Sequence, residues 1–501
     1  MKKSLLILSL VLGAFAGKAQ NVAQEAAGLY NGQLLISIQN EISDETATPL
    51  EGQSIVIEAQ SSNTVKFALY NFSLAEGFTL GDIILENIPV SKSSDGKITF
   101  GKNNPVRFAF MDGGILADAS INTTGSYVSN GSARVDVDVV WVQDEDNNIP
   151  IYVRFVGEKA TLQVPNSDFE SWVHDNEPGN GWYSFHSAGG SQAGSGRSLS
   201  EGLTTKVTGA NAYQGGTSVQ IESKWVGVLF IGANANGNLT TGRVNMGSMT
   251  PADAANHNYT DRSSENSCRF EGRPDSVAYY ATFKRGESGN YRGRLHLVLH
   301  GDIDYKDPSE SDDNKAKYLV AEATVYADVT DTWKRFCGPL SYTDIEGDKT
   351  YMLCSFTTNE TPGGSTGDVM RIDNVEFIYN SELSTFYYNG ARKKILPAMK
   401  LENEEFDASK LTLTANGRGA TILTSYDKDS ALLTITVRGQ NAAEKPSNVH
   451  VYTVQFKKEE TSISTIATPS PNASAVYDIQ GRRVMPTSKG IYIIGGKKVL
   501  R

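Results

Sequence analysis

Apolar and polar residues alternate in many short runs along the chain, and this period of two is the pattern of β-strands. The clearest run extends from Ser132 to Val142, with Val135, Val137, Val139 and Trp141 on one face and Arg134, Asp136 and Asp138 on the other. Turn-forming pairs such as Asp95-Gly96 and Asn130-Gly131 separate neighbouring runs. The pattern predicts an all-β protein in which hairpins connect most strands.

A chain of 501 residues is too long for one hydrophobic core, because single domains usually hold roughly 100–200 residues. We divide it into a signal peptide, a barrel, a sandwich, a small sandwich, a linker and a tail. Their predicted ranges are residues 1–20, 21–159, 160–382, 383–458, 459–475 and 476–501. The linker is inferred from the Ser, Thr and Pro residues between 461 and 474, a composition that favours an extended segment.

The first residues carry the pattern of a secretory signal. Lys2 and Lys3 precede an apolar stretch from Leu5 to Ala16, which is shorter than the roughly 20 residues that span a bilayer. We therefore expect an exported chain without a transmembrane segment, located at the cell surface, in the periplasm or outside the cell. The net charge of −11 argues against a nucleic-acid partner, because an acidic surface repels phosphate.

Residues 21–159 have the strand spacing of a closed or nearly closed antiparallel barrel. The segment Gly28–Gly32, the pair Asn71-Phe72, the segment Gly81–Ile83 and the closing run Ile149–Gly157 resemble the calycin-like domain of exported Bacteroidetes proteins. The resemblance implies a barrel whose mouth can hold a small apolar ligand. A barrel filled by its own side chains is the alternative.

Residues 160–382 contain ordered motifs of a second domain. The segments Val164–Trp172, Gly215–Ile221 and Met370–Phe377 resemble the β-sandwich jelly rolls of carbohydrate-binding modules. Together with Phe270–Asp275 and Trp333–Phe336, they are similar to the carbohydrate metabolism domain of Bacteroidetes proteins, PCMD. The resemblance implies a jelly roll and a carbohydrate partner, without assigning a mechanism.

Aromatic and polar residues of this segment are candidates for sugar contacts, since aromatic faces stack on pyranose rings while polar groups orient the hydroxyls. The candidates are Trp182, Tyr183, Trp225 and Arg273, with Arg294, His296 and His300 on one face of a predicted strand. Positions in the core, at a rim or on an ordinary solvated face are the alternatives. His296 and His300 cannot share one metal ion, because strand residues four apart lie roughly 13 Å from each other.

A structural calcium site is implied by the resemblance to sugar-binding jelly rolls. There, a Glu of the opening motif and an Asp of the closing motif often meet at an ion, and here these residues are Glu170 and Asp373. Asn166 or Asp168 could add oxygen ligands, which calcium prefers. The alternative is that backbone N–H groups or Arg371 cap the two carboxylates.

Three cysteines, Cys268, Cys337 and Cys354, are too few for a disulfide-stabilised scaffold. Cys337 and Cys354 lie on runs that could be neighbouring strands, so one bridge between them and two free thiols are both open.

Beyond the small immunoglobulin-like sandwich predicted for residues 383–458, the segments Val476–Val484 and Gly490–Ile494 precede a basic end. They resemble the C-terminal sorting tail of the Bacteroidetes type IX (Por) secretion route. An ordinary terminal β-hairpin is the alternative.

From these features we expect a non-catalytic exported or cell-surface protein that binds carbohydrate through its central jelly roll. The first alternative is a glycan-processing enzyme, which requires two carboxylates facing each other across a cleft. The second is a structural or adhesive surface subunit that binds another protein. Sequence alone names neither the glycan nor the protein partner.

Overall fold

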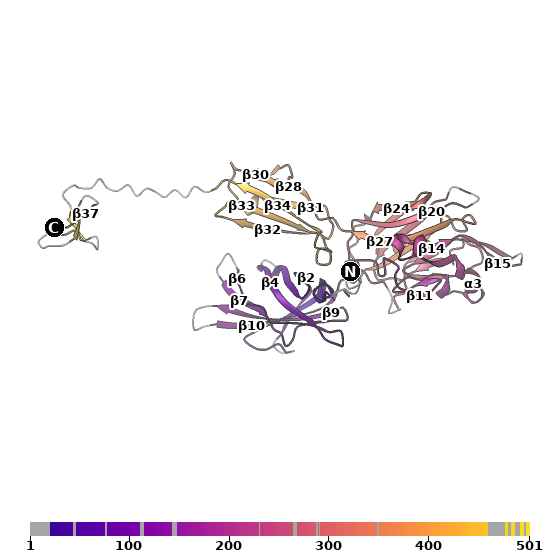
Figure 1. Ribbon diagram of the computed structural model, residues 1–501, viewed down its shortest axis with the longest axis horizontal. Coiled ribbons are helices and arrows are strands. Elements are labelled where there is room, and N and C mark those ends of the chain that lie inside the picture. The colour runs from indigo at the N-terminus through magenta and orange to yellow at the C-terminus, as the bar shows by residue number, and fades with distance from the viewer. Residues whose placement is uncertain are drawn as a thin grey trace, which may run out of the picture. The chain divides into compact units, whose positions relative to one another are not determined.

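The computed structural model describes residues 21–43, 47–75, 78–110, 115–142, 148–229, 231–263, 268–286, 289, 291–347, 350–458, 476–478, 482–485, 491–494 and 497–500. The predicted signal peptide (1–20) and linker (459–475) lie outside these residues. Nearly all regular elements are strands (Figure 1), so the predicted all-β fold class is confirmed. Among the described residues, no helix is both long and apolar enough to cross a membrane.

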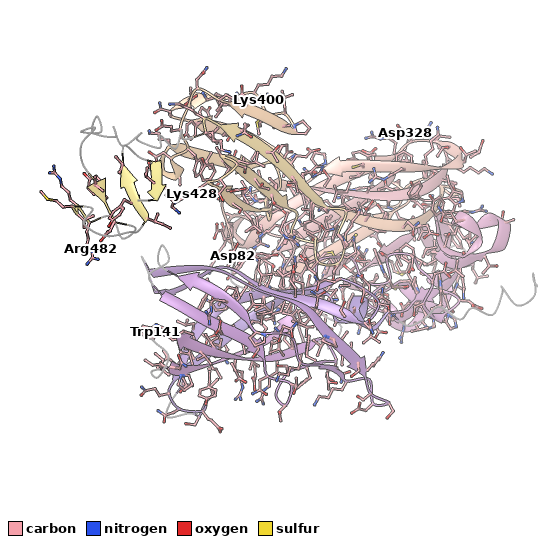
Figure 2. All side chains as sticks on the ribbon, turned by 60° about the vertical axis from the view of Figure 1, so that its left-hand side comes forward. Asp82, Trp141, Asp328, Lys400, Lys428 and Arg482 are labelled. Atoms are coloured by element: carbon pink, nitrogen blue, oxygen red, sulfur yellow. The ribbon has the colours of Figure 1, made fainter. Side chains whose placement is uncertain are left out.

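The described residues belong to two compact units. One is drawn from Met1–Lys394, Thr412–Leu423 and Thr436–Val451, and the other from Ile395–Leu411, Thr424–Ile435 and Tyr452–Arg501. Charged side chains such as Asp82 and Lys400 on strands, and Asp328 and Lys428 in the turns between strands, are exposed (Figure 2).

The N-terminal part of the first unit is a closed antiparallel barrel. A short helix, α2 (Val22–Ala26), precedes it, and its strand order is β10-β1-β2-β3-β4-β5-β8-β9-β7-β6. Because β10 pairs with both β1 and β9, the sheet closes on itself. The strands are β1 (Gly28–Ile38), β2 (Thr48–Ala59), β3 (Thr64–Ala75), β4 (Phe78–Lys92), β5 (Ile98–Phe100), β6 (Val106–Phe110), β7 (Ile115–Ile121), β8 (Tyr127–Ser129), β9 (Ser132–Val142) and β10 (Asn148–Lys159).

Side chains fill the interior of the barrel. On β9, Val135, Val137 and Val139 are buried while the charged residues between them are only partly covered, as the alternation predicts. Aromatic side chains from other strands pack with them, among them Tyr30, Phe67, Phe100 and Phe155. A period of two therefore places one side of each strand in the core.

The central part of the first unit is a β-sandwich of two five-stranded antiparallel sheets. The first sheet has the order β13-β14-β27-β20-β24 and the second has the order β17-β26-β21-β23-β25. The first contains β13 (Thr204–Thr208), β14 (Thr217–Glu222), β20 (Ser276–Lys284), β24 (Thr330–Pro339) and β27 (Val369–Ile378). The second contains β17 (Asn238–Thr240), β21 (Gly293–His300), β23 (Leu319–Ala327), β25 (Ser341–Tyr342) and β26 (Tyr351–Thr357).

One hydrophobic core joins the two sheets. Tyr279 and Phe283 of β20 pack in it with Leu295, Leu297 and Leu299 of β21, all fully buried. The leucines therefore occupy the core face of β21, and Arg294 and His296 point to the opposite face of the second sheet. That opposite face carries the site described below.

Smaller elements surround the sandwich. They are β11 (Trp172–His174), β12 (Glu177–Pro178), η1 (Phe185–Ser187), α3 (Ala193–Ser200), η2 (Glu201–Leu203), η3 (Gly209–Asn211), η4 (Tyr213–Gly215), β15 (Lys224–Val228), β16 (Ile231–Ala235), β18 (Arg243–Asn245), β19 (His257–Tyr259), β22 (Lys306–Asp307) and α4 (Asp312–Tyr318). β15 and β16 form a separate hairpin, and β18, β19 and β22 form a small sheet.

Residues 383–456 form two further sheets, in the orders β29-β28-β31 and β30-β34-β33-β32. Their elements are β28 (Leu383–Tyr388), β29 (Ala391–Arg392), β30 (Ala398–Leu401), η5 (Ala408–Lys410), β31 (Leu411–Ala415), β32 (Thr421–Asp427), β33 (Leu432–Arg438) and β34 (Val449–Phe456). In the tail, β36 (Ile491–Ile494) and β37 (Lys497–Leu500) form the predicted hairpin, and β35 (Val476–Tyr477) adds a third strand.

All three cysteines are free. Cys337 lies on β24 of the first sandwich sheet and Cys354 on β26 of the second, so the two runs are not neighbouring strands as the bridged alternative requires. Cys268 and Cys354 are buried. Burial raises the pKa of the Cys268 thiol to about 12, so this thiol stays protonated and unreactive at neutral pH.

Candidate functional site

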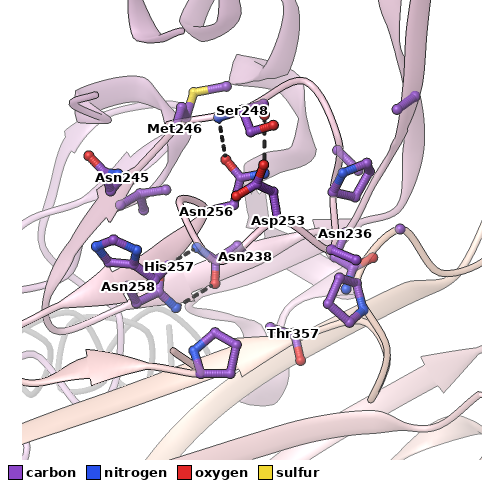
Figure 3. A pocket seen from close by; sticks show the side chains of 18 of the residues that line it. Asn236, Asn238, Asn245, Met246, Ser248, Asp253, Asn256, His257, Asn258 and Thr357 are labelled. Atoms are coloured by element: carbon purple, nitrogen blue, oxygen red, sulfur yellow. Dashed lines mark hydrogen bonds between the residues drawn. The ribbon is translucent and has the colours of Figure 1, made fainter. Parts of the chain in front are cut away.

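A groove of about 290 Å³ lies beside the face of the second sandwich sheet that points away from the core. Its lining comes from β16 to β19, from β21, and from the loop between β18 and β19 (Figure 3). The lining is rich in amide side chains: Asn234, Asn236, Asn238, Asn245, Asn256, Asn258 and Asn359. Apolar side chains stand among them, including Val226, Val244, Met246, Met249, Pro251 and Pro308.

Asn256 holds the loop from Met246 to Asn256 in a fixed shape. Its Oδ1 accepts the N–H groups of Gly247 and Ser248, both at 3.0 Å. Its Nδ2 donates to the carbonyl oxygens of Ser248 at 3.1 Å and Thr250 at 2.8 Å. One side chain thus makes four hydrogen bonds to the loop backbone (Figure 3 includes part of this network), so this wall of the groove exists before any ligand arrives.

Two reciprocal asparagine pairs stabilise the rest of the lining. Asn238 and Asn258 each donate an amide N–H to the other's oxygen, at 2.8 and 3.1 Å (Figure 3). Asn236 and Asn359 do the same at 2.8 and 3.2 Å. Asn236, Asn258 and Asn359 each donate a second time, to the Thr361 carbonyl, Ser355 Oγ and Ser223 Oγ, so what these three amides can offer a ligand is oxygen lone pairs. The groove therefore presents oriented polar groups.

Arg294 of β21 lines the groove and is half-buried. Within the described part of the chain, its guanidinium has no hydrogen bond and no ion pair. By contrast, the neighbouring Arg292 is paired with Glu360 at 2.9 Å and lies over the Tyr326 ring. A guanidinium carries five N–H donors, so Arg294 is available to a ligand with oxygen acceptors.

His296 and Asp307 form a largely buried pair at the base of this region. His296 Nδ1 lies 2.9 Å from Asp307 Oδ1, and the Asp307 carboxyl also lines the groove. Burial acts to raise the pKa of Asp307, but the hydrogen bond and charge of His296 outweigh it, so the pKa is lowered. Burial acts to lower the pKa of His296, and the hydrogen bonds to Asp307 and Glu322 outweigh it, so this pKa is raised.

The other groove carboxylates are also engaged. Asp253 accepts the N–H of Ala255 at 2.9 Å, and this bond and one from Ser248 lower its pKa. Glu360 is bound by Arg292. Asp253 and Asp307 thus stay ionised at neutral pH, which suits hydrogen-bond acceptance and not proton donation.

His300 was expected on an accessible sheet face, and this expectation is wrong. The side chain is fully buried: its Nε2 lies 2.7 Å from Thr260 Oγ1, its Nδ1 lies 2.8 Å from the carbonyl oxygen of Gly301, and its ring stacks on Tyr305. Thr260, from the segment after β19, and Tyr305, from the segment that follows β21, close over this end of β21. Burial lowers the pKa of His300 to about 4, so the ring is neutral. His296 is only 14% exposed and does not line the groove.

Trp182 and Tyr183 are also unavailable as sugar-stacking surfaces. Trp182 is 1% exposed, packs against Phe169 and Phe356 in the core, and donates its indole N–H to the carbonyl of Pro165 at 2.8 Å. Tyr183 is 9% exposed, and the Arg243 guanidinium lies 4.0 Å from its ring centroid. Both rings therefore already have their faces occupied by protein.

Trp225 and Arg273 are placed away from the groove lining. Trp225 is 47% exposed on β15, and its indole lies against Gly227 and Gly232, where an added Cβ would come within 2.6 Å of the ring. These glycines let the ring lie flat on the hairpin. Arg273 donates through Nη2 to the carbonyl of Glu346 at 2.6 Å, so it binds to a loop. Of the seven predicted sugar-contact residues, Arg294 alone lines the groove.

Glu170 and Asp373 lie close together, as the resemblance to sugar-binding jelly rolls implies. Glu170 Oε1 accepts the Thr217 N–H at 2.8 Å, and Asp373 accepts the Ser218 hydroxyl and the Asn374 N–H, the latter at 2.7 Å. Burial first, and then the charges of Glu170 and Asp168, outweigh these hydrogen bonds and raise the pKa of Asp373 to about 6. Backbone N–H groups thus contact both carboxylates, while Arg371 bonds to Gln220 instead.

The two remaining calcium candidates differ in their surroundings. The Asn166 side chain is fully used in its own loop: it accepts the Ser171 N–H and donates to the carbonyls of Ser171 and Gly179. Asp168 contributes its charge to the environment of Asp373. Asn166 therefore shapes the loop that carries Glu170.

Sequence reasoning missed an aromatic cluster on the first sandwich sheet. Tyr213 stacks on Tyr280 with ring centroids 4.4 Å apart, and Trp333 meets Tyr213 edge-on at 5.5 Å. The three residues come from η4, β20 and β24, and all are half-buried. Tyr280 pairs in register with Asp373, so the cluster adjoins the carboxylates. Only strand register, which a single sequence does not give, brings these rings together.

Residues 26–158 match the family model of the calycin-like β-barrel domain. No curated protein matches the chain. Among solved structures, a Bacteroides fragilis protein described as an outer membrane protein is 16% identical with a TM-score of 0.22; the match covers 28% of this chain and 53% of that one, about half its length.

Two further solved structures are similar to parts of this chain. Carbohydrate-binding modules of the β-sandwich superfamily give 9% identity, covering 58% and 97% of the two chains at a TM-score of 0.21. SGBP-B from a xyloglucan utilization locus of Bacteroides uniformis gives 13% identity, 70% and 92% coverage and a TM-score of 0.19. At TM-scores this low, none of the three structures supports an inference about this chain.

Proposed function

We propose that this chain is a non-catalytic carbohydrate-binding protein whose ligand occupies the groove of the central sandwich. The observation that carries the proposal is Arg294, whose guanidinium makes no hydrogen bond or ion pair with the described residues, within a lining of oriented asparagines. The motifs that resemble those of carbohydrate-binding jelly rolls lie in the same sandwich.

The lining suits a sugar in two ways. Sugar hydroxyl groups can donate to the amide oxygens of Asn236, Asn245 and Asn258 and can accept the second amide N–H of Asn245. The C–H faces of a sugar ring need apolar surface, which Met246, Met249 and Pro251 supply. Because Asn256 already fixes the loop, little ordering entropy is lost when a ligand binds.

The groove favours binding over hydrolysis. A glycoside hydrolase needs one carboxyl group with a raised pKa to protonate the leaving oxygen. The pKa values of Asp253 and Asp307 are lowered instead, and Glu360 forms an ion pair with Arg292. These acids can accept hydrogen bonds from sugar hydroxyls.

The test is a glycan array followed by calorimetric titration of the best-binding glycan. Arg294→Ala is expected to weaken binding by about tenfold or more, because a charge-assisted hydrogen bond to a ligand contributes roughly 1.5–3 kcal/mol. Arg335→Ala is the matched control, since Arg335 lies on β24 of the other sheet, paired with Glu376. Binding to no glycan, or equal losses in both variants, contradicts the proposal.

A second candidate function is adhesion to a protein partner, and the β15–β16 hairpin favours it. Val228, Leu229 and Ile231 are 59%, 84% and 76% exposed around its turn. A cluster of exposed apolar side chains often marks an interaction surface. Crosslinking in cells that captures one partner with the natural chain, and loses it with Leu229→Asp, would support this function; unchanged capture would contradict it.

We also propose that Glu170 and Asp373 bind a structural calcium ion. The buried Asp373 has acidic neighbours, and a divalent cation would offset their repulsion. Within the described residues, Glu170, Asp168 and Asp373 do not converge as a group within 4.8 Å, so an ion would have to draw them closer. Calcium should raise the melting temperature of the natural chain and leave that of Asp373→Asn unchanged.

The proposal also includes export of the chain. We infer from residues 1–20 and from the tail motifs that the chain leaves the cytoplasm and reaches the surface through its C-terminal segment, and that its sandwich is of the PCMD type. Cell fractionation tests this inference. Removal of residues 476–501 is expected to trap the chain before the surface, and surface display of the truncated chain would contradict it.

A further inference from the structure

Three metal-binding side chains meet on the sandwich outside the groove and outside the proposed calcium site. His174 ends β11, His186 lies in η1, and Glu201 begins η2. Each offers one ligand atom, and these atoms all lie within 4.8 Å of one another. The three side chains are 45%, 34% and 35% exposed, so a dissolved ion can reach them.

One carboxylate oxygen is at the centre of the cluster. Glu201 Oε1 lies 2.6 Å from His186 Nδ1 and 3.6 Å from His174 Nδ1. The two imidazole rings stack on each other, with centroids 4.0 Å apart and planes inclined by 13°. The short contact means that His186 Nδ1 donates its proton to Glu201.

The longer contact joins two acceptors. His174 Nδ1 accepts the backbone N–H of Asn176 at 3.2 Å, so this nitrogen presents a lone pair and its proton is on Nε2. Glu201 Oε1 is likewise an acceptor, of the His186 proton. These two acceptor atoms lie 3.6 Å apart without a proton between them, and a cation shared by them would replace the 3.2 Å bond from Asn176 at the single lone pair of His174 Nδ1.

We propose that His174, His186 and Glu201 bind a divalent transition-metal ion, Zn²⁺ or a chemically similar one. Two imidazole nitrogens and one carboxylate oxygen match the ligand preference of zinc, whose bonds to them are about 2.0–2.2 Å long. The ion takes the place of the proton between His186 and Glu201, and that proton moves through solvent to His186 Nε2, so the imidazole stays neutral. Three protein ligands leave a fourth position to water.

Binding requires a small rearrangement. Stacked rings direct their lone pairs side by side instead of toward one point, so at least one imidazole must rotate about its Cβ–Cγ bond. The exposure of both rings leaves room for this rotation. Once bound, the ion links β11, η1 and η2, and Phe185 and Ser200, the residues just before two of the ligands, belong to the groove lining.

The experiment uses the full chain without a polyhistidine tag, treated with a chelator and then titrated with Zn²⁺ in a calorimeter. Co²⁺ serves as an optical probe, since its visible absorption reports nitrogen and oxygen ligands. We expect one high-affinity Zn²⁺ per chain and at least about tenfold weaker binding for each of His174→Asn, His186→Asn and Glu201→Gln, because losing even an outer-sphere partner costs about that much. His257→Asn, a histidine outside the cluster, is the control.

Two results would overturn the proposal. One is the absence of Zn²⁺ binding by a chain whose circular dichroism shows it to be folded. The other is binding that persists in the three cluster variants or is lost equally in His257→Asn. Neither result depends on the carbohydrate function, because the titration contains no glycan.

Discussion

Asp373 accepts a hydrogen bond from Ser218 of β14, and the residue before Ser218, Thr217, holds Glu170 through its backbone N–H. The opening and closing segments of the sandwich therefore meet on one strand. The backbone shows the same contact, since the Val375 N–H donates to the Ser167 carbonyl at 2.9 Å. This arrangement buries the carboxyl group of Asp373 close to the carboxyl groups of Glu170 and Asp168.

Replacing Asp373 by Asn should stabilise the chain at neutral pH when no divalent cation is present. The folded-state pKa is raised from 3.8 to about 6, so folding is favoured while Asp373 is protonated and is weakened as pH rises through about 6. The gain is at most about 3 kcal/mol near pH 8 and vanishes below pH ~4. Urea unfolding with a chelator measures it, and lower stability of the variant at both pH values would contradict the account.

The buried His300 predicts a loss of stability in mild acid. Its folded-state pKa is lowered from 6.5 to about 4, so its contribution is complete above pH 6.5 and is lost as pH falls toward 4. The loss should approach about 3 kcal/mol. His300→Gln, which can keep a polar contact to Thr260, should flatten this part of the pH profile. His257→Gln should not, and an identical profile for both variants would contradict the assignment.

Asn256→Ala removes the four hydrogen bonds that shape one wall of the groove. Because the loop carbonyls and N–H groups can form hydrogen bonds with water instead, we expect a loss of only about 1–3 kcal/mol of stability. Glycan affinity should fall by about tenfold, since the loop must then be ordered on binding. Asn314→Ala on α4 is the control. Calorimetry that finds full affinity in Asn256→Ala would show that the wall does not contact the ligand.

Leu297→Ala tests the core between the two sheets. Leu297 is fully buried at the centre of β21 and belongs to the core that joins both sheets, so its truncation leaves a cavity. Substitutions of this kind cost about 2–5 kcal/mol. Val329→Ala, at a half-exposed position, should cost less than about 1 kcal/mol. Chemical denaturation compares them, and equal effects would exclude Leu297 from the core.

Local periodicity was sufficient where one face of a strand is buried and the other is not. It placed Val135, Val137 and Val139 of β9 on one face of their strand, and the structure buries that face in the barrel core. The resemblance to sugar-binding jelly rolls also implied that Glu170 and Asp373 lie close together. The first feature depends on residues close in sequence, and the second on β14, whose Thr217 and Ser218 hold the two carboxylates.

The period-two pattern did not predict which side chains are exposed where segments outside the two sandwich sheets cover one of them. His300 has the spacing of an exposed position, but Thr260 and Tyr305 approach it from the covering segments. The groove was missed for the same reason, since Asn256, Asn258 and Asn359 meet only after the loops fold over the sheet. A strand pattern describes two faces and does not reveal what lies on either.

Hydrogen–deuterium exchange with and without the best-binding glycan tests the central claim most directly, because it locates the ligand without any substitution. The account predicts slower exchange in residues 246–258 and in β21 when the glycan is present. Slower exchange confined to the strands that carry Tyr213, Tyr280 and Trp333, or no change in residues 246–258, would contradict it.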